Sequence, residues 1–207
     1  KSIAGVRTDA SVKLYVEQKL VCEDRGEVQL TDCGISGIPV FQVSRYAAKA
    51  LGRGERVQAA LDFVPFLGNG DLFWEVKGRF MRGDGKTAEE ALVGLFSKKL
   101  IPVFLKQNGI LLKGDAAAVP EGKLRALCGY LKEAWVDIIG TKGFEAAQVS
   151  AGGIDTREIC AETMESVLEP GLYFAGEVVD VDGMCGGYNL QWAWSSGYVA
   201  GSHAAVG

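Results

Sequence analysis

The sequence predicts an α+β fold that consists of a β-rich part, a small helical part and a C-terminal strand, loop and helix. Three observations lead to this prediction. Apolar residues alternate with polar ones in the first eighty residues, they recur at helical spacing from about residue 84, and a glycine-rich loop precedes a helix in the last sixty residues. With 207 residues, 48% of them hydrophobic, the chain can bury a sizeable core.

Three alternating segments and one helix make up the predicted β-rich part. The helix is expected over residues 36–52, with Ser36 as its cap, Pro39 in its first turn and Gly52 as its stop signal. The alternating segments are Val12, Leu14 and Val16; Val57, Ala59, Leu61 and Phe63; and Leu72, Trp74 and Val76. The residues expected on the buried face of the helix are Ile38, Phe41, Ala48 and Leu51. We therefore expect one helix lying across a half-buried antiparallel sheet or small barrel.

The helical part begins with a capping box formed by Thr87 and Glu90. The apolar residues that follow at helical spacing are Ala88, Leu92, Leu95 and Phe96. A second short helix is expected over 102–109, from its proline to its glycine, and a third over 120–132. Segment 134–140 then returns to strand-like composition.

These patterns divide the chain into three predicted domains. Residues 1–83 and 132–145 form a β-rich domain, and residues 84–131 form a helical subdomain inserted in it. Residues 146–207 form a separate C-terminal part.

The C-terminal part reads as an apolar strand over 171–179, a glycine-rich loop over 181–189 and a helix over 190–205. One face of this helix carries Leu190, Trp194, Gly197 and Gly201. Because two of these residues have no side chain, we expect the helix to approach a sheet closely.

The glycine-rich loop is the main candidate binding site. Gly183, Gly186 and Gly187 allow the backbone to come close to a ligand, and the free N–H groups of the helix that starts at Tyr188 favour negative charge. The alternative is a tight turn in which Asn189 caps the helix. Taken alone, the loop leaves both interpretations open.

Glu177 is a second candidate, because it follows Gly176 at the end of the predicted strand. A carboxylate at the C-terminal end of such a strand can accept hydrogen bonds from ligand hydroxyls, such as those of a ribose or ribityl chain. The alternative is a solvated charge at the end of a strand.

Composition excludes several other classes of function. The formal net charge of −4 does not fit a generic basic nucleic-acid binder, and no apolar run is long enough to span a membrane. The five cysteines contain no C-x-x-C pair, so we expect no zinc site and a reducing, cytoplasmic environment. His203 is the single histidine, which leaves little for a histidine-based mechanism.

Four stretches of the sequence resemble one known family. They are 31–45 (TDCGISGIPVFQVSR), 146–159 (AAQVSAGGIDTREI), 163–166 (TMES) and 171–201 (GLYFAGEVVDVDGMCGGYNLQWAWSSGYVAG). Together they are similar to the BaiN-like, aminoacetone-oxidase-type family of FAD-dependent oxidoreductases. The resemblance implies that the first 145 residues are an inserted substrate domain and that residues 146–207 are the C-terminal part of a Rossmann-like FAD-binding domain.

The resemblance also implies roles for particular residues. Gly176 and Glu177 match a strand end near the ribityl and pyrophosphate groups of FAD. The residues that match the loop and helix start facing the pyrimidine edge of the flavin are Gly186, Gly187, Tyr188, Asn189 and Leu190. There the helix N-terminus would stabilise the negative charge of reduced flavin. Gly152 and Gly153 match a glycine turn, for which flavin contact and a purely structural role are equally open.

The chain departs from the family in one respect. It lacks the G-x-G-x-x-G fingerprint that holds the FAD pyrophosphate in the family. The nearest strings, at 52–57 and 68–73, lack the third glycine. Since the first residue is lysine, we expect a fragment that begins after this fingerprint. Alone, it is expected to bind FAD weakly or not at all, and its expected partner is the N-terminal half of the same polypeptide.

The expected reaction is hydride or two-electron transfer through flavin N5 to a small-molecule substrate, with NAD(P)H as one candidate electron donor. Oxygen-dependent amine oxidation and nicotinamide-driven reduction both remain open, and no catalytic residue is assigned. The competing hypothesis is a non-enzymatic binding or interaction module.

Overall fold

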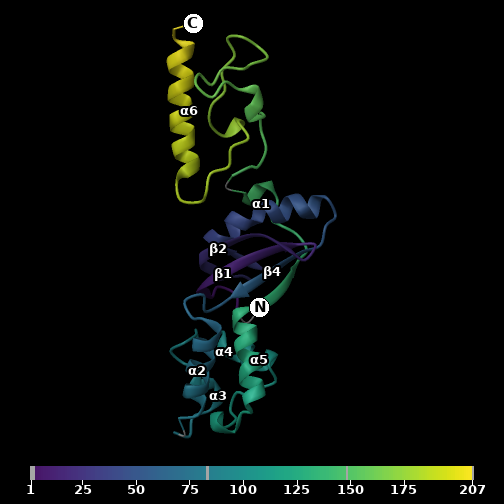
Figure 1. The fold of residues 1–207 in the computed structure, drawn as a ribbon, viewed down its shortest axis with the longest axis vertical. Coiled ribbons are helices and arrows are strands. Elements are labelled where there is room, and N and C mark those ends of the chain that lie inside the picture. The colour runs from purple at the N-terminus through teal and green to yellow at the C-terminus, as the bar shows by residue number, and fades with distance from the viewer. Residues whose placement is uncertain (1–2, 83, 148, 207) are drawn as a thin grey trace. The chain divides into compact units, whose positions relative to one another are not determined.

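The computed structural model describes residues 3–82, 84–147 and 149–206 (Figure 1). By its contacts the chain divides into two compact units, Lys1–Thr141 and Lys142–Gly207, which we call the sheet unit and the terminal unit. Within the described residues, no helix combines the length and the hydropathy needed to cross a membrane.

The sheet unit contains one five-stranded antiparallel sheet in the order β3-β2-β1-β4-β5. The strands are β1 (Arg7–Val16), β2 (Lys19–Leu30), β3 (Ile35–Gly37), β4 (Val57–Asp62) and β5 (Ala134–Ile138). The alternation that predicted β1 and β4 is confirmed, since Val12, Leu14 and Leu61 are buried. Strand β5 confirms the strand-like reading of segment 134–140.

Helix α1 (Ile38–Gly52) covers one face of this sheet, as predicted, but it is capped and rotated differently from the prediction. Its N-cap is Gly37, with φ 108° and no side-chain cap, because Ser36 is paired within β3. Ile38 and Phe41, expected inside, are 54% and 43% exposed. The residues that α1 buries are Pro39, Val43, Ala47 and Ala50. Pro39 sets this rotation, since it packs directly over Gly26 of β2.

Segment 72–76 is a helix rather than the third predicted strand. It lies within α2 (Asn69–Phe80), where Leu72, Val76 and Phe80 are buried at helical spacing and Trp74 is 66% exposed. The same five residues satisfy both a period of two and a period of 3.6, so local sequence could not decide between them. Packing against α5 (Glu121–Lys132) selects the helix.

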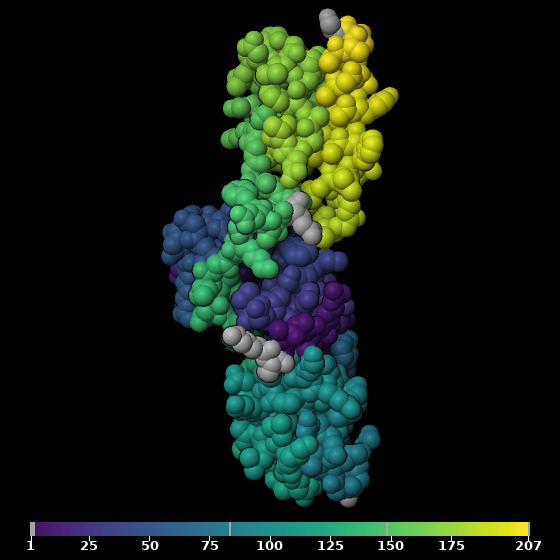
Figure 2. Space-filling view, turned by 180° about the vertical axis from the view of Figure 1, so that it is seen from behind, coloured from purple at the N-terminus to yellow at the C-terminus, as the bar shows by residue number. Residues whose placement is uncertain are grey.

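The other helices follow the sequence closely. The capping box is confirmed, because Glu90 N–H donates to Thr87 Oγ1 and Thr87 N–H donates to Glu90 Oε2 at 2.8 Å. The elements around it are α3 (Ala88–Ala91), α4 (Ile101–Gln107), the 3₁₀ turn η1 (Ala116–Ala118) and α5, which starts directly after Pro120. Helix α3 is only one turn long, so Leu92 and the residues after it pack from turns rather than from a continued helix. Figure 2 shows the teal helical segment as one continuous body.

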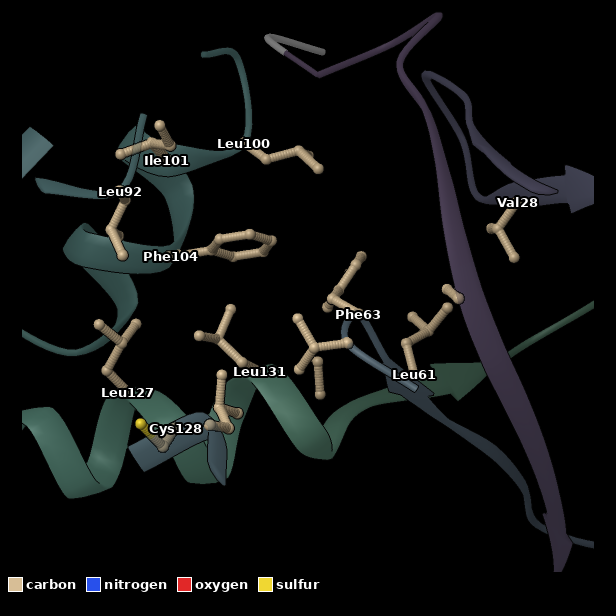
Figure 3. Packing of buried hydrophobic residues seen from close by; sticks show 14 of the residues in the cluster. Val28, Leu61, Phe63, Leu92, Leu100, Ile101, Phe104, Leu127, Cys128 and Leu131 are labelled. Carbon is tan, nitrogen blue, oxygen red and sulfur yellow. The ribbon is translucent and has the colours of Figure 1, made fainter. Parts of the chain in front are cut away.

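One hydrophobic core joins the sheet to these helices. Figure 3 shows the ring of Phe104 of α4 pointing towards Phe63, the residue that follows β4, with Leu131 of α5 close by. The rings of Phe63 and Phe104 have centroids 5.0 Å apart, and Phe63 N–H donates to Leu131 O at 2.8 Å. The helical segment is therefore anchored to the sheet through the end of β4.

The buried thiol of Cys128 gives a first testable prediction. Burial raises its pKa to about 11, whereas the pKa of Cys160 is lowered because Thr163 and nearby backbone N–H groups hydrogen-bond its sulfur. Only thiolates react readily, so we expect iodoacetamide at pH 8 to label Cys160 at least about tenfold faster than Cys128. Mass spectrometry of quenched samples measures both rates, and equal rates in the folded chain would contradict the prediction.

The thiol of Cys128 also makes the stability of the folded state depend on pH. The pKa of Cys128 is higher in the folded state than its ordinary value of 9.0. The stability that depends on the neutral thiol is therefore fully present below pH 9 and is lost as the pH rises towards about 11.

The terminal unit is built from short turns around one long helix. Its elements are the 3₁₀ turns η2 (Phe144–Ala146), η3 (Thr156–Glu158) and η4 (Gly176–Val178), and helix α6 (Tyr188–Ala204). Its small buried core consists of Ile159, Met164, Val179 and Ala200. Helix α6 confirms the last predicted helix.

The strand predicted over 171–179 is not formed. Near its C-terminal end the segment forms η4, with Gly176 at φ 72°, and only two isolated bridges, Glu165↔Tyr173 and Ile154↔Val179, involve the segment among the described residues. A parallel strand needs neighbouring strands to pair its N–H and C=O groups. The terminal unit supplies one short parallel contact, at Ile154, so the apolar segment turns instead.

Candidate functional site

The glycine-rich loop ends in an open backbone turn at the start of α6. Gly186 and Gly187 have φ of 126° and 99°, and within the described chain no atom lies within 4 Å of the position that a Cβ would take at either residue. Gly187 is the N-cap of α6, and this helix has no side-chain cap and no acidic residue in its first turn. The first N–H groups of a helix have no partner within it, so this N-terminus favours a negative group from elsewhere.

The side chain of Asn189 closes the loop and does not cap the helix. Its Oδ1 accepts from Gly183 N–H at 2.7 Å, and its Nδ2 donates to Gly183 O at 3.2 Å. A Cβ at Gly183 would lie 2.9 Å from the Cβ of Tyr188. The interpretation of Asn189 as the N-cap is therefore wrong, and the amide side chain fixes the loop in a closed ring with Gly183.

Gly176 is placed against the middle of α6. Its N–H donates to Ser196 Oγ at 2.9 Å, and its carbonyl accepts from Trp192 Nε1 at 3.0 Å. Ser196 in turn donates to Trp192 O at 2.6 Å. These bonds position the middle of α6 relative to η4. Ser196 was not predicted from the sequence. The available signal was a small hydroxyl residue on the buried side of an otherwise apolar helix.

Glu177 is exposed, and its Oε1 accepts from Ser150 N–H at 3.0 Å. The carboxylate is thus oriented by the backbone of the preceding segment. The structure brings Glu177 and Gly176 together with α6 through η4, although the element that carries them is a turn and not a strand end.

The turn at Gly152 and Gly153 clamps two segments together. Ile154 N–H donates to Val178 O at 2.8 Å, and Asp180 N–H donates to Ile154 O at 3.0 Å. A Cβ at Gly153 would lie 2.4 Å from Val178 O. This close approach of two backbones gives the glycine turn a structural role.

One face of α6 is uncovered within the described part of the terminal unit. Leu190, Trp194 and Tyr198 are 68%, 77% and 78% exposed, and no atom lies within 4 Å of a Cβ position at Gly197 or Gly201. The predicted approach to a sheet is therefore not made by the described residues. Most monomeric proteins do not expose apolar patches of this kind without a partner.

The chain is similar to a known family of proteins and to several characterised relatives. A model described as the HI0933-like protein Rossmann domain matches residues 86–203. The chain is 43% identical over 202 residues to a 3-dehydro-bile acid delta(4,6)-reductase of Clostridium scindens, covering 98% of this chain and 49% of that protein. It is also similar to two ribosomal RNA dihydrouridine synthases. The synthase from Haemophilus influenzae is 36% identical, and the alignment covers 83% of this chain and 40% of that protein. The synthase from Escherichia coli is 51% identical, and the alignment covers 84% of this chain and 41% of that protein.

The chain thus spans less than half the length of each of these relatives. Its family match covers more than half of its own residues and includes the loop, the turn at Gly176 and α6. This chain belongs to the HI0933-like family of Rossmann-domain proteins.

Proposed function

We propose that this chain is part of an FAD-dependent oxidoreductase, in which the glycine loop and the start of α6 face the pyrimidine edge of the flavin. The observation that carries the proposal is the N-terminus of α6, which follows two glycines with open Cβ positions and has no side-chain cap. Membership in a Rossmann-domain family with a reductase among its members supports it.

The residues present fit such a group. The loop offers backbone N–H donors and space, and the first turn of α6 has no carboxylate that would repel negative charge. When bound, FAD would supply hydride transfer through its N5 atom. The amides at Tyr188, Asn189 and Leu190 would stabilise negative charge on the ring, Gly186 and Gly187 would admit its edge, and Gly176 with Glu177 would lie near the ribityl chain.

The names of the relatives favour a reduction over oxygen-dependent amine oxidation. A 3-dehydro steroid with a delta-4 double bond has that bond conjugated to its ketone. Dihydrouridine differs from uridine by two hydrogens across a double bond that is conjugated to a ring carbonyl. We propose that the complete protein reduces a carbon–carbon double bond conjugated to a carbonyl group, with NAD(P)H as electron donor.

We further propose that the uncovered face of α6 packs against a sheet of the FAD domain contributed by polypeptide outside these 207 residues. Leu190 and Trp194 would fill the contact, and Gly197 and Gly201 would allow close approach of the backbones. A cytoplasmic location accompanies this proposal and is supported by the five cysteines, all of which are free thiols.

FAD binding gives the direct test. At the length of its relatives the protein is expected to be yellow, with absorbance near 450 nm, whereas the 207 residues alone are expected to be colourless. In the longer protein, Glu177→Ala is expected to weaken FAD binding about tenfold, since a hydrogen bond to a charged group contributes about 1.5–3 kcal/mol. Glu169→Ala, which removes an exposed carboxylate of the same unit, serves as the control.

Two results would contradict the proposal. A colourless longer protein that gains no absorbance from added FAD would favour the non-enzymatic binding module. Stoichiometric FAD retention by the 207 residues would show that the cofactor site needs no further polypeptide. The reaction is tested separately. Under anaerobic conditions NAD(P)H is expected to bleach the bound flavin, and a conjugated enone is expected to restore its colour. If oxygen restores the colour and the enone does not, the result would favour the oxidase.

A further inference from the structure

A groove of about 540 Å³ opens to solvent beside α2 in the sheet unit. The residues that line it are Phe66, Leu67, Asp71, Trp74, Glu75 and Leu95. It includes none of the residues assigned above to the cofactor site.

The sequence of α2 places three of these side chains on one stripe of the helix. Asp71, Trp74 and Glu75 are spaced three and four residues apart, so they are neighbours on the helix surface. Leu67 comes from the turn before α2 and Leu95 from the turn after α3, and both pack against the main core. The groove therefore has an apolar floor and a helix stripe with two carboxylates along one side.

The aromatic walls of the groove are unusually exposed. Trp74 is 66% exposed and Phe66 is 57% exposed. The ring of Trp74 is already within reach of a cation, because Lys77 Nζ lies 5.3 Å from its centroid. An indole ring attracts ammonium and guanidinium groups through its negative face.

Two carboxylates line the groove, and two cations, Lys77 and Arg79, lie beside it. Its charged lining residues among those described are Asp71 and Glu75. Glu75 is held by Arg79, whose Nε lies 2.6 Å from Glu75 Oε1, whereas Asp71 forms no ion pair within the described chain. A ligand that combines an apolar stem with a flat cationic end would match the floor, the aromatic wall and the carboxylate of Asp71.

We propose that this groove binds an arginine side chain from a basic segment of a partner protein. The aliphatic stem of the arginine lies on Leu67 and Leu95, and the guanidinium lies against Trp74 and donates to Asp71. Arginine fits better than lysine, since its planar group both stacks on aromatic rings and donates to a carboxylate as a fork. The groove is open at the surface, which suits a side chain that projects from another protein.

The test uses the 207-residue chain and the blocked peptide acetyl-Gly-Arg-Gly-amide. The indole N–H signals of the four tryptophans are followed by NMR, and Trp74→Phe assigns the signal of Trp74. The arginine peptide is expected to shift this signal saturably. The matched peptide with citrulline, which has the same shape without the charge, is expected to bind at least about fivefold more weakly.

Variants locate the effect. Asp71→Asn is expected to weaken binding of the arginine peptide at least about fivefold, and Asp32→Asn, an exposed aspartate in another turn, is expected to leave it unchanged. Equal binding of both peptides, or unchanged binding by Asp71→Asn, would overturn the proposal. Binding of agmatine without binding of the arginine peptide would overturn the assignment to a protein segment and indicate a small cation.

Discussion

Replacing Gly153 by alanine is expected to destabilise the clamp between segments 150–154 and 176–180 by about 3 kcal/mol or more. The added Cβ would lie 2.4 Å from Val178 O and 2.9 Å from Asp180 N, so one backbone must move away from the other. Gly153 also has φ of 150°, which an L-residue rarely adopts. Strain of about 1–2 kcal/mol and overpacking of about 1–3 kcal/mol together account for the expected loss.

Gly152→Ala is the matched control, because Gly152 also has a positive φ, of 99°, but no atom of the described residues lies within 4 Å of its Cβ position. This variant is expected to lose only the strain, about 1–2 kcal/mol. Hydrogen exchange at the amides of Ile154 and Asp180 measures both effects, since these amides form the bonds of the clamp. Equal loss of protection in the two variants would show that the close approach to Val178 costs nothing.

The second large effect is expected from Lys132→Met. Lys132 Nζ lies 2.5 Å from Asp62 Oδ2 and also donates to Val64 O and Leu67 O, at 3.2 and 2.9 Å. Asp62 is only 8% exposed. Removing the ammonium leaves a largely buried carboxylate whose remaining hydrogen-bond donor among the residues that the structure describes is Val64 N–H, so we expect a loss of about 3 kcal/mol in the free energy of unfolding.

Urea denaturation of the sheet unit, followed by circular dichroism, measures this loss. Lys113→Met removes an ion pair with Glu89 in which the lysine side chain is 81% exposed, and it is expected to cost less than about 1 kcal/mol. The double variant Asp62→Asn with Lys132→Met should recover part of the lost stability, because the buried charge is gone. A single variant as stable as the original chain would show that the pair contributes nothing.

Local signals were sufficient wherever they were specific. The capping box at Thr87, the proline that precedes α5 and the alternation in β1 each predicted an element that the structure contains. Segment 72–76 could not be predicted, because its short apolar run fits two periods and the choice depends on distant packing. The rotation of α1 likewise depends on Pro39 meeting Gly26, a contact between elements.

For the candidate site, the glycine-rich loop predicted where the last helix begins, and α6 starts directly after Gly187 without a side-chain cap. The partner of Asn189 was not predictable, because an asparagine near a helix start can bond to several backbone groups, and Gly183 is one of them. The strand over 171–179 was predicted from composition alone. Its failure to form reflects the neighbours it would need, which composition does not report.

The pairing of β4 with β5 has a consequence for how this family could change in length. Leu61 and Ala134 are direct partners across these strands, so the chain leaves the sheet and re-enters it at one place. The segment between these two residues, 62–133, is therefore attached to the sheet at two neighbouring positions. The register of the strands does not depend on the length of this segment. The segment can therefore be lengthened, shortened or replaced in related sequences while the strands keep their register. The condition is that Phe63 and Leu131, at its two ends, stay in contact.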